Sequence, residues 1–114
     1  MQTKSRQYYS CPGAVRKGDV VGLSGTDMVA RTCRFSFAAR PVGIVSKVTS
    51  PTRCTVTSQG VIPNFSESFK TGTKIYMSPY EPGKVSCEEP DSVYANALVG
   101  VIINGTDLVV IAGD

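Results

Sequence analysis

The C-terminal end of the chain carries two uninterrupted apolar runs joined by a turn signal. The runs, 98–103 and 108–111, flank Asn104-Gly105, a dipeptide typical of a tight β-hairpin. Neither run alternates apolar with polar residues, so both faces of each predicted strand need to be covered. A chain of 114 residues builds one core. We therefore expect the second covering layer to be another subunit, which favours an assembly protein over a catalyst.

The rest of the chain is a series of short β-branched segments between Gly and Pro turn signals. Spacings of roughly 8–12 residues between such segments are typical of a small β-barrel or sandwich. We predict an all-β fold of about eight short strands in a single domain, 18–114. The predicted strands are 19–23, 28–31, 42–48, 53–58, 74–77, 84–87 and the two of the C-terminal hairpin. Only 91–96 fits a helical turn.

Residues 1–17 read differently from the domain that follows them. They hold four cationic side chains, no acid and the adjacent pair Tyr8-Tyr9. Polar termini are often mobile until something holds them, whereas tyrosine is a favoured interface anchor. We predict an extended N-terminal arm that contacts a partner and whose removal leaves the domain folded; the alternative is a tail without a role. The candidate contact residues are Arg6, Tyr8, Tyr9 and Arg16.

The charge of the chain is divided unevenly along its length. Residues 1–53 carry nine Lys or Arg and two acids, a net +7, whereas 54–114 carry three Lys and seven acids, a net −4. Ordinary surface scatter is one interpretation, because a barrel brings distant segments together. The other is a molecule with a basic and an acidic pole, suited to docking on copies of itself or on an acidic partner.

Catalytic and metal chemistry find little support in the sequence. The chain has no histidine, which excludes Ser-His and Cys-His nucleophile pairs. Its cysteines, more than twenty residues apart, lack the close spacing of a zinc site, so we predict no metal and no cofactor. We expect free thiols, with one disulfide left open, and we expect Cys54 to share a buried strand face with Val56. The cysteines are Cys11, Cys33, Cys54 and Cys87.

The only acidic cluster is Glu88, Glu89 and Asp91 around Pro90. Two carboxylates can serve glycoside hydrolysis, and a loop of oxygens can hold calcium. We expect a solvated surface loop instead.

A basic stretch without acids, from Arg31 to Arg53, raises the question of nucleic acid. Together with aromatic rings, such a stretch would resemble a surface that binds single-stranded nucleic acid. However, Phe35 and Phe37 alternate with Ser36, which predicts that the rings point inward as core. We therefore do not expect nucleic acid as a partner. The N-terminus has no apolar stretch of a secretion signal and no apolar run reaches eighteen residues, so we predict no leader and no membrane span.

The order of the strand-turn segments resembles a known class of small β-domains. The resemblance covers about 18–111. Its segments are 18–21 (GDVV), 41–46 (PVGIVS), 56–61 (VTSQGV), 72–78 (GTKIYMS), 82–86 (PGKVS), 99–103 (VGVII) and 108–111 (LVVI). In this order they are similar to the β-domain of tailed-phage capsid decoration, or cement, proteins and of related modules in phage head and tail fibres.

The resemblance implies a structural role without enzymatic activity. Such proteins bind the outside of an expanded capsid, commonly as trimers, and clamp neighbouring coat subunits. It implies the major capsid protein and copies of the chain itself as partners, and the capsid exterior of a virion as location. The arm residues are then the candidate capsid contacts, and the C-terminal strands supply the trimer interface or the core. The residues assigned to that interface or core are Val99, Val101, Val109 and Ile111.

Two other functions remain open at this point. A receptor- or glycan-binding module of a phage fibre predicts exposed aromatic side chains among Tyr76, Tyr80 and Tyr94. A small hydrolase predicts carboxylates that face a pocket.

Overall fold

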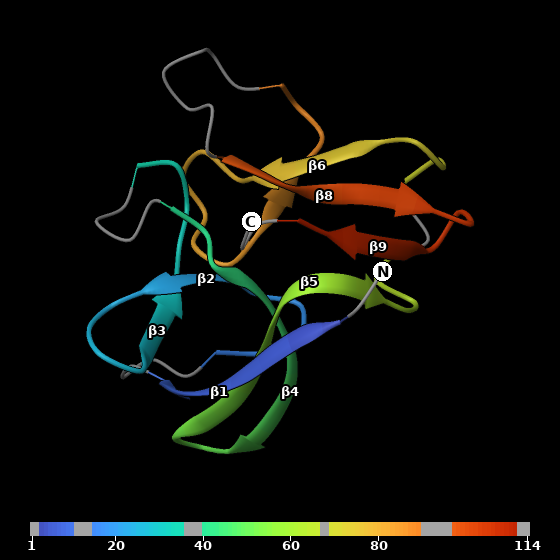
Figure 1. Cartoon of the computed structure of the whole chain (residues 1–114). Coiled ribbons are helices and arrows are strands. Elements are labelled where there is room, and N and C mark those ends of the chain that lie inside the picture. Colours follow the sequence, from blue (N-terminus) through green and yellow to red (C-terminus); the bar gives the residue numbers. More distant parts are fainter. Residues whose placement is uncertain (1–2, 11–14, 36–39, 67–68, 90–96, 112–114) are drawn as a thin grey trace.

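The computed structural model describes residues 3–10, 15–35, 40–66, 69–89 and 97–111. These residues form nine β-strands and no α-helix, so the all-β prediction is confirmed (Figure 1). The strands are β1 (Lys4–Ser10), β2 (Val20–Leu23), β3 (Met28–Arg31), β4 (Gly43–Ser50), β5 (Arg53–Ile62), β6 (Lys74–Met77), β7 (Val85–Ser86), β8 (Leu98–Ile103) and β9 (Asp107–Val110).

Five of the strands close into a barrel. The strand order is β1-β3-β2-β4-β5, and β1 also pairs with β5, which completes the ring. β1 runs parallel to β3 and antiparallel to β5. The remaining strands continue the sheet beyond β5 in the order β9-β8-β6-β7. Figure 1 shows the barrel in the lower half of the view and this second sheet above it.

Strand β5 belongs to both halves of the molecule. Its first part pairs with β1 and β4, and Gly60, Val61 and Ile62 pair with β9. Gly60 has a φ of +124°, and a Cβ there would lie 2.7 Å from Thr3 Oγ1. Only glycine allows both this backbone conformation and so close an approach, so Gly60 fixes the point where β5 leaves the barrel.

The described residues form two apolar clusters, one of which joins the two halves. One fills the barrel and includes Val21, Val45 and Val56. The other lies under the second sheet and includes Val20 and Ile44 beside Ile102 and Leu108. Successive residues of a strand point to opposite faces, so β2 and β4 each contribute to both clusters. The second sheet therefore packs on the outer wall of the barrel at β2 and β4.

The predicted arm is part of the barrel. Residues 4–10 are extended, as predicted, but they lie as β1 between β3 and β5. The expected separation between an arm at 1–17 and a domain at 18–114 does not hold for these residues. The physical reason lies in the main chain. A polar segment has the same backbone donors and acceptors as an apolar one, so it can pair equally well in a sheet. We therefore expect removal of β1 to open the barrel, contrary to the sequence-based expectation that the domain stays folded without it.

Candidate functional site

The neighbours Tyr8 and Tyr9 of β1 point to opposite sides of the barrel wall. Tyr8 is half-buried and packs against the cluster inside the barrel. The Arg6 guanidinium lies 5.1 Å from the centre of the Tyr8 ring and forms an ion pair with Asp27 of the β2–β3 turn. Arg6 and Tyr8, two of the predicted contact residues, are therefore engaged within the chain.

Tyr9 faces outward and is 50% exposed. It lies directly opposite Arg53 in the β1–β5 ladder, and the Arg53 guanidinium stands 4.3 Å from the centre of its ring. The same guanidinium donates a hydrogen bond of 3.1 Å to Gln7 Oε1. The cation is thus held in place over the ring, and the contact costs little additional ordering when a partner binds.

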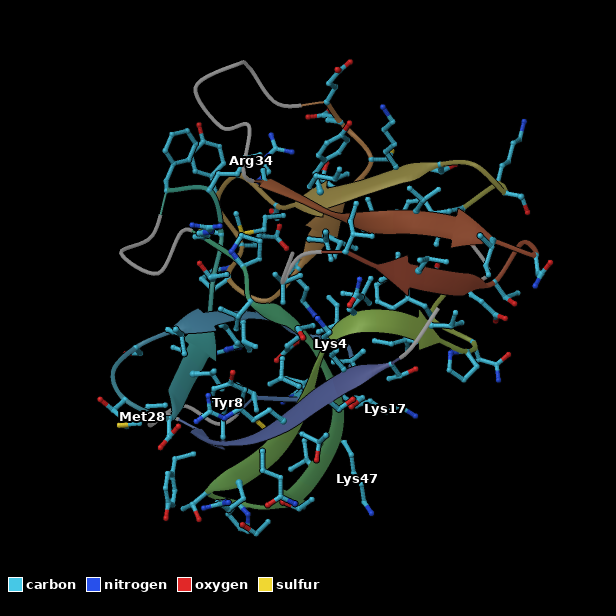
Figure 2. The ribbon with its side chains drawn as sticks, viewed as in Figure 1. Lys4, Tyr8, Lys17, Met28, Arg34 and Lys47 are labelled. Atoms are coloured by element: carbon cyan, nitrogen blue, oxygen red, sulfur yellow. The ribbon has the colours of Figure 1, made fainter. Side chains whose placement is uncertain are left out.

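The surroundings of Tyr9 extend this surface over three strands. Gln7, Thr55 and Lys47 lie side by side across β1, β5 and β4. We call the outward surface of Gln7, Tyr9, Lys47, Arg53 and Thr55 the barrel face. It presents two cations, one ring and no acid, and Figure 2 shows Lys47 at the lower end of the molecule. Such a face suits an acidic protein surface, since Tyr and Arg are the side chains that most often anchor interfaces.

The outward position of Arg53 is encoded in the sequence, although its contact with Tyr9 is not. Cys54 and Val56 are buried in the barrel, as predicted, so period-2 alternation turns Arg53 and Thr55 outward. What the sequence did not reveal is that Tyr9 lies beside Arg53. Arg16, the fourth predicted contact, is exposed, and its backbone N–H donates to Asp19 Oδ2 at 2.8 Å; the described contacts do not join it to the barrel face.

The C-terminal residues divide between the core and the outside of the second sheet. Val99 is fully buried in the core. Val101 and Val109 are half-buried and lie opposite each other, and Val61 of β5 continues the same row. Ile111 is also half-buried. The row Val61-Val109-Val101 is an apolar strip on the outer surface of the sheet.

Phe35, which follows β3, and Tyr80, which lies between β6 and β7, form an aromatic pair. Phe35 and Tyr80 stack with ring centroids 5.0 Å apart and an interplanar angle of 19°. They are 54% and 76% exposed, so the prediction that Phe35 is core is wrong. Phe35 follows β3 and lies outside any strand, so alternation with Ser36 does not fix its direction; Phe37 lies outside the described residues. Of the tyrosines proposed for a glycan site, Tyr76 is buried, and Tyr94 is not among the described residues.

Arg34 precedes Phe35 and joins the β3 side of the chain to the segments around Ser78 and Glu88. It is buried, its backbone N–H donates to Ser78 O at 3.0 Å, and its Nη2 donates to Glu88 O at 2.9 Å. Its buried Nε has no hydrogen-bond partner among the described residues. Figure 2 shows Arg34 at the end of the molecule opposite Lys47, so the basic half of the sequence is not confined to one pole.

Cys54 and Cys87 are free thiols, as expected. Cys33 and Cys54 are buried and Cys87 is exposed; Cys11 lies outside the described residues. Burial raises the pKa of the Cys54 thiol, and the neighbouring Arg53 charge opposes the increase. A thiol that stays protonated at neutral pH is a poor nucleophile.

The described residues bring together no three metal-binding side chains. Glu88 and Glu89 are exposed, in agreement with the predicted surface loop, and Asp91 is not among the residues described. No helix within the described ranges is long and apolar enough to cross a membrane. Comparisons with family models, with curated proteins and with solved structures found no match for the chain.

Proposed function

We propose that the chain is a structural virion protein that binds the outer capsid surface and stabilises the expanded phage head. It would act as a homotrimer on the major capsid protein and catalyse no reaction. The observation that carries the proposal is the outward pairing of Tyr9 with Arg53 on a rigid, closed barrel. Such a preorganised cationic and aromatic face loses little entropy on docking against an acidic shell.

Three copies would make a modest contact effective. Each barrel face in a trimer binds weakly, but the second and third faces bind at high effective concentration once the first has docked. Binding that requires the assembled shell stabilises that shell by mass action. The proposal therefore needs no large interface on a single copy.

The test is co-sedimentation with purified coat shells. We expect Arg53→Glu and Tyr9→Ala each to weaken binding about tenfold or more, since anchor residues of this type carry most of an interface's binding energy. Lys70→Glu and Tyr80→Ala are the matched controls, because they change an exposed lysine and an exposed tyrosine outside the barrel face. Binding that is unchanged in Arg53→Glu, or lost equally in Lys70→Glu, would contradict the proposal.

A glycan-binding fibre module is the second candidate, favoured by the exposed aromatic pair Phe35–Tyr80. A ring of this kind can stack on the apolar face of a sugar. The same variants distinguish the two functions, because each function predicts loss of binding in a different variant. On host cells, Tyr80→Ala should abolish binding and Tyr9→Ala should preserve it, whereas the capsid role predicts the opposite pattern on coat shells.

A further inference from the structure

A groove runs along the junction between the barrel and the second sheet. It consists of two adjoining hollows of about 220 and 250 Å³ that share Lys17, Gly18 and Phe65 in their walls. It lies away from the barrel face, since none of the five residues of that face lines it. In Figure 2, Lys17 projects from the right side of the barrel.

The floor of the groove is apolar and firmly held. Phe65, Phe69 and Val85 are half-buried and pack against the core under the second sheet. The Phe65 segment is fixed by its backbone: the N–H groups of Phe65 and Ser66 donate to Thr106 O at 2.8 and 3.2 Å. The Phe65 part of the floor is therefore held in place before anything binds, which lowers the cost of binding.

The rim of the groove is cationic. Lys17 and Lys84 line it and are exposed, and neither forms an ion pair with a described residue. The third charged lining residue, Asp19, is buried, and its Oδ2 accepts the N–H of Arg16 at 2.8 Å. Two exposed ammonium groups beside an apolar floor favour a ligand that has both carboxylates and apolar side chains.

The groove also adjoins the edge of the second sheet. Among the described strands, β7 is the last in the sheet order and pairs with β6 alone, and its Val85 lines the groove. The unpaired main-chain groups of an edge strand can hydrogen-bond to an added strand. An extended segment laid along the groove would lie next to such an edge.

We propose that the groove binds an extended segment of a partner protein in which apolar side chains alternate with carboxylates. The apolar side chains would lie on Phe65 and Phe69, and the carboxylates would face Lys17 and Lys84. This is peptide recognition beside a strand edge, with side-chain alternation giving specificity. The inference is independent of the capsid role, because it concerns a different surface.

To test this proposal, the isotope-labelled full chain is titrated at low salt with a short synthetic peptide of alternating valine and glutamate. Binding is followed by the chemical shifts of the amide groups in NMR spectra. We expect saturable shifts confined to the groove residues. Lys17→Glu and Lys84→Glu should each weaken binding about tenfold, whereas Lys70→Glu and Lys74→Glu, which change exposed lysines outside the groove, should leave it within about twofold.

Two further peptides make the outcome decisive. Alternating valine and lysine should not bind, and alternating serine and glutamate should bind at least about tenfold more weakly. Equal binding of either peptide, absence of binding by the valine–glutamate peptide, or lysine variants that bind normally would overturn the proposal. Lys17→Glu leaves the barrel face unchanged, so its co-sedimentation with coat shells tests the capsid role alone. Failure of the groove proposal is therefore distinguishable from failure of the capsid role.

Discussion

At the scale of single residues, one β-strand gives two adjacent tyrosines different roles. Tyr8 packs inside the barrel, and Tyr9 stands outside under the guanidinium of Arg53. The sequence suggested both as contacts, because a tyrosine pair in a polar terminus resembles an interface anchor. Only the ladder between β1 and β5 assigns each to its side, and that pairing joins residues far apart in the chain.

The Cys54 thiol makes the stability of the fold depend on pH. Burial raises its pKa in the folded chain, so the folded state prefers the neutral thiol. The associated stability is complete below the unfolded thiol's pKa of about 8.5 and is lost as the pH rises through that value toward the raised pKa of the folded state. We expect the urea midpoint to fall between pH 8 and pH 10 more in the native chain than in Cys54→Ala.

The quantity to compare is the change of the urea midpoint with pH and not the midpoint itself, because the alanine variant is less stable at every pH. Equal declines in both chains would show that the Cys54 thiol does not titrate differently on unfolding. Treatment with a thiol reagent at neutral pH is a check on burial: the exposed Cys87 should react before Cys33 and Cys54.

At the scale of elements, β1 is the strand that closes the barrel. It pairs with β3 on one side and β5 on the other, and Tyr8 covers the cluster that contains Cys54 and Val56. Deleting residues 1–10 should therefore leave two open strand edges and an uncovered core. Folded domains are stable by only about 5–15 kcal/mol, so we expect the deletion to abolish cooperative unfolding in urea, as followed by circular dichroism.

The matched control for that deletion is Gln7→Ala, which keeps the strand and removes only an outward side chain. It should unfold cooperatively, close to the native midpoint. A deleted chain with an unchanged midpoint would mean that β1 is dispensable, as an arm would be.

The elements that the sequence predicts well are those with local signals. Strands 28–31 and 74–77 have the predicted bounds, and Asn104 and Gly105 both adopt the left-handed conformation of a hairpin turn. β1 escapes prediction because its sequence is polar. The first three residues of β2 and of β4 are buried on both faces, because the second sheet of the same chain covers the barrel wall there. No local pattern specifies this packing.

At the scale of the whole molecule, the apolar strip Val61-Val109-Val101 bears on self-association. The sequence predicts that both faces of the C-terminal strands are covered. Within one chain Ile102, Leu108 and Val110 are fully buried, whereas Val101 and Val109 on the opposite face are only half-buried. A sister copy on the strip would remove the remaining apolar area from water, at about 25 cal/mol for each Å². Under the trimer proposal we expect a species of about 36 kDa, three times the 12.1 kDa of the chain.

Two valines of equal exposure allow the strip to be tested with its own control. Val61, on the strip, and Val48, on the barrel strand β4, are each 43% exposed. We expect Val61→Lys to convert the trimer to monomer, because it places a charge in an apolar contact, and Val48→Lys to leave the mass unchanged. Light scattering after size exclusion measures both. A monomeric native chain at high concentration, or equal dissociation by the two lysines, would exclude the strip as the trimer contact.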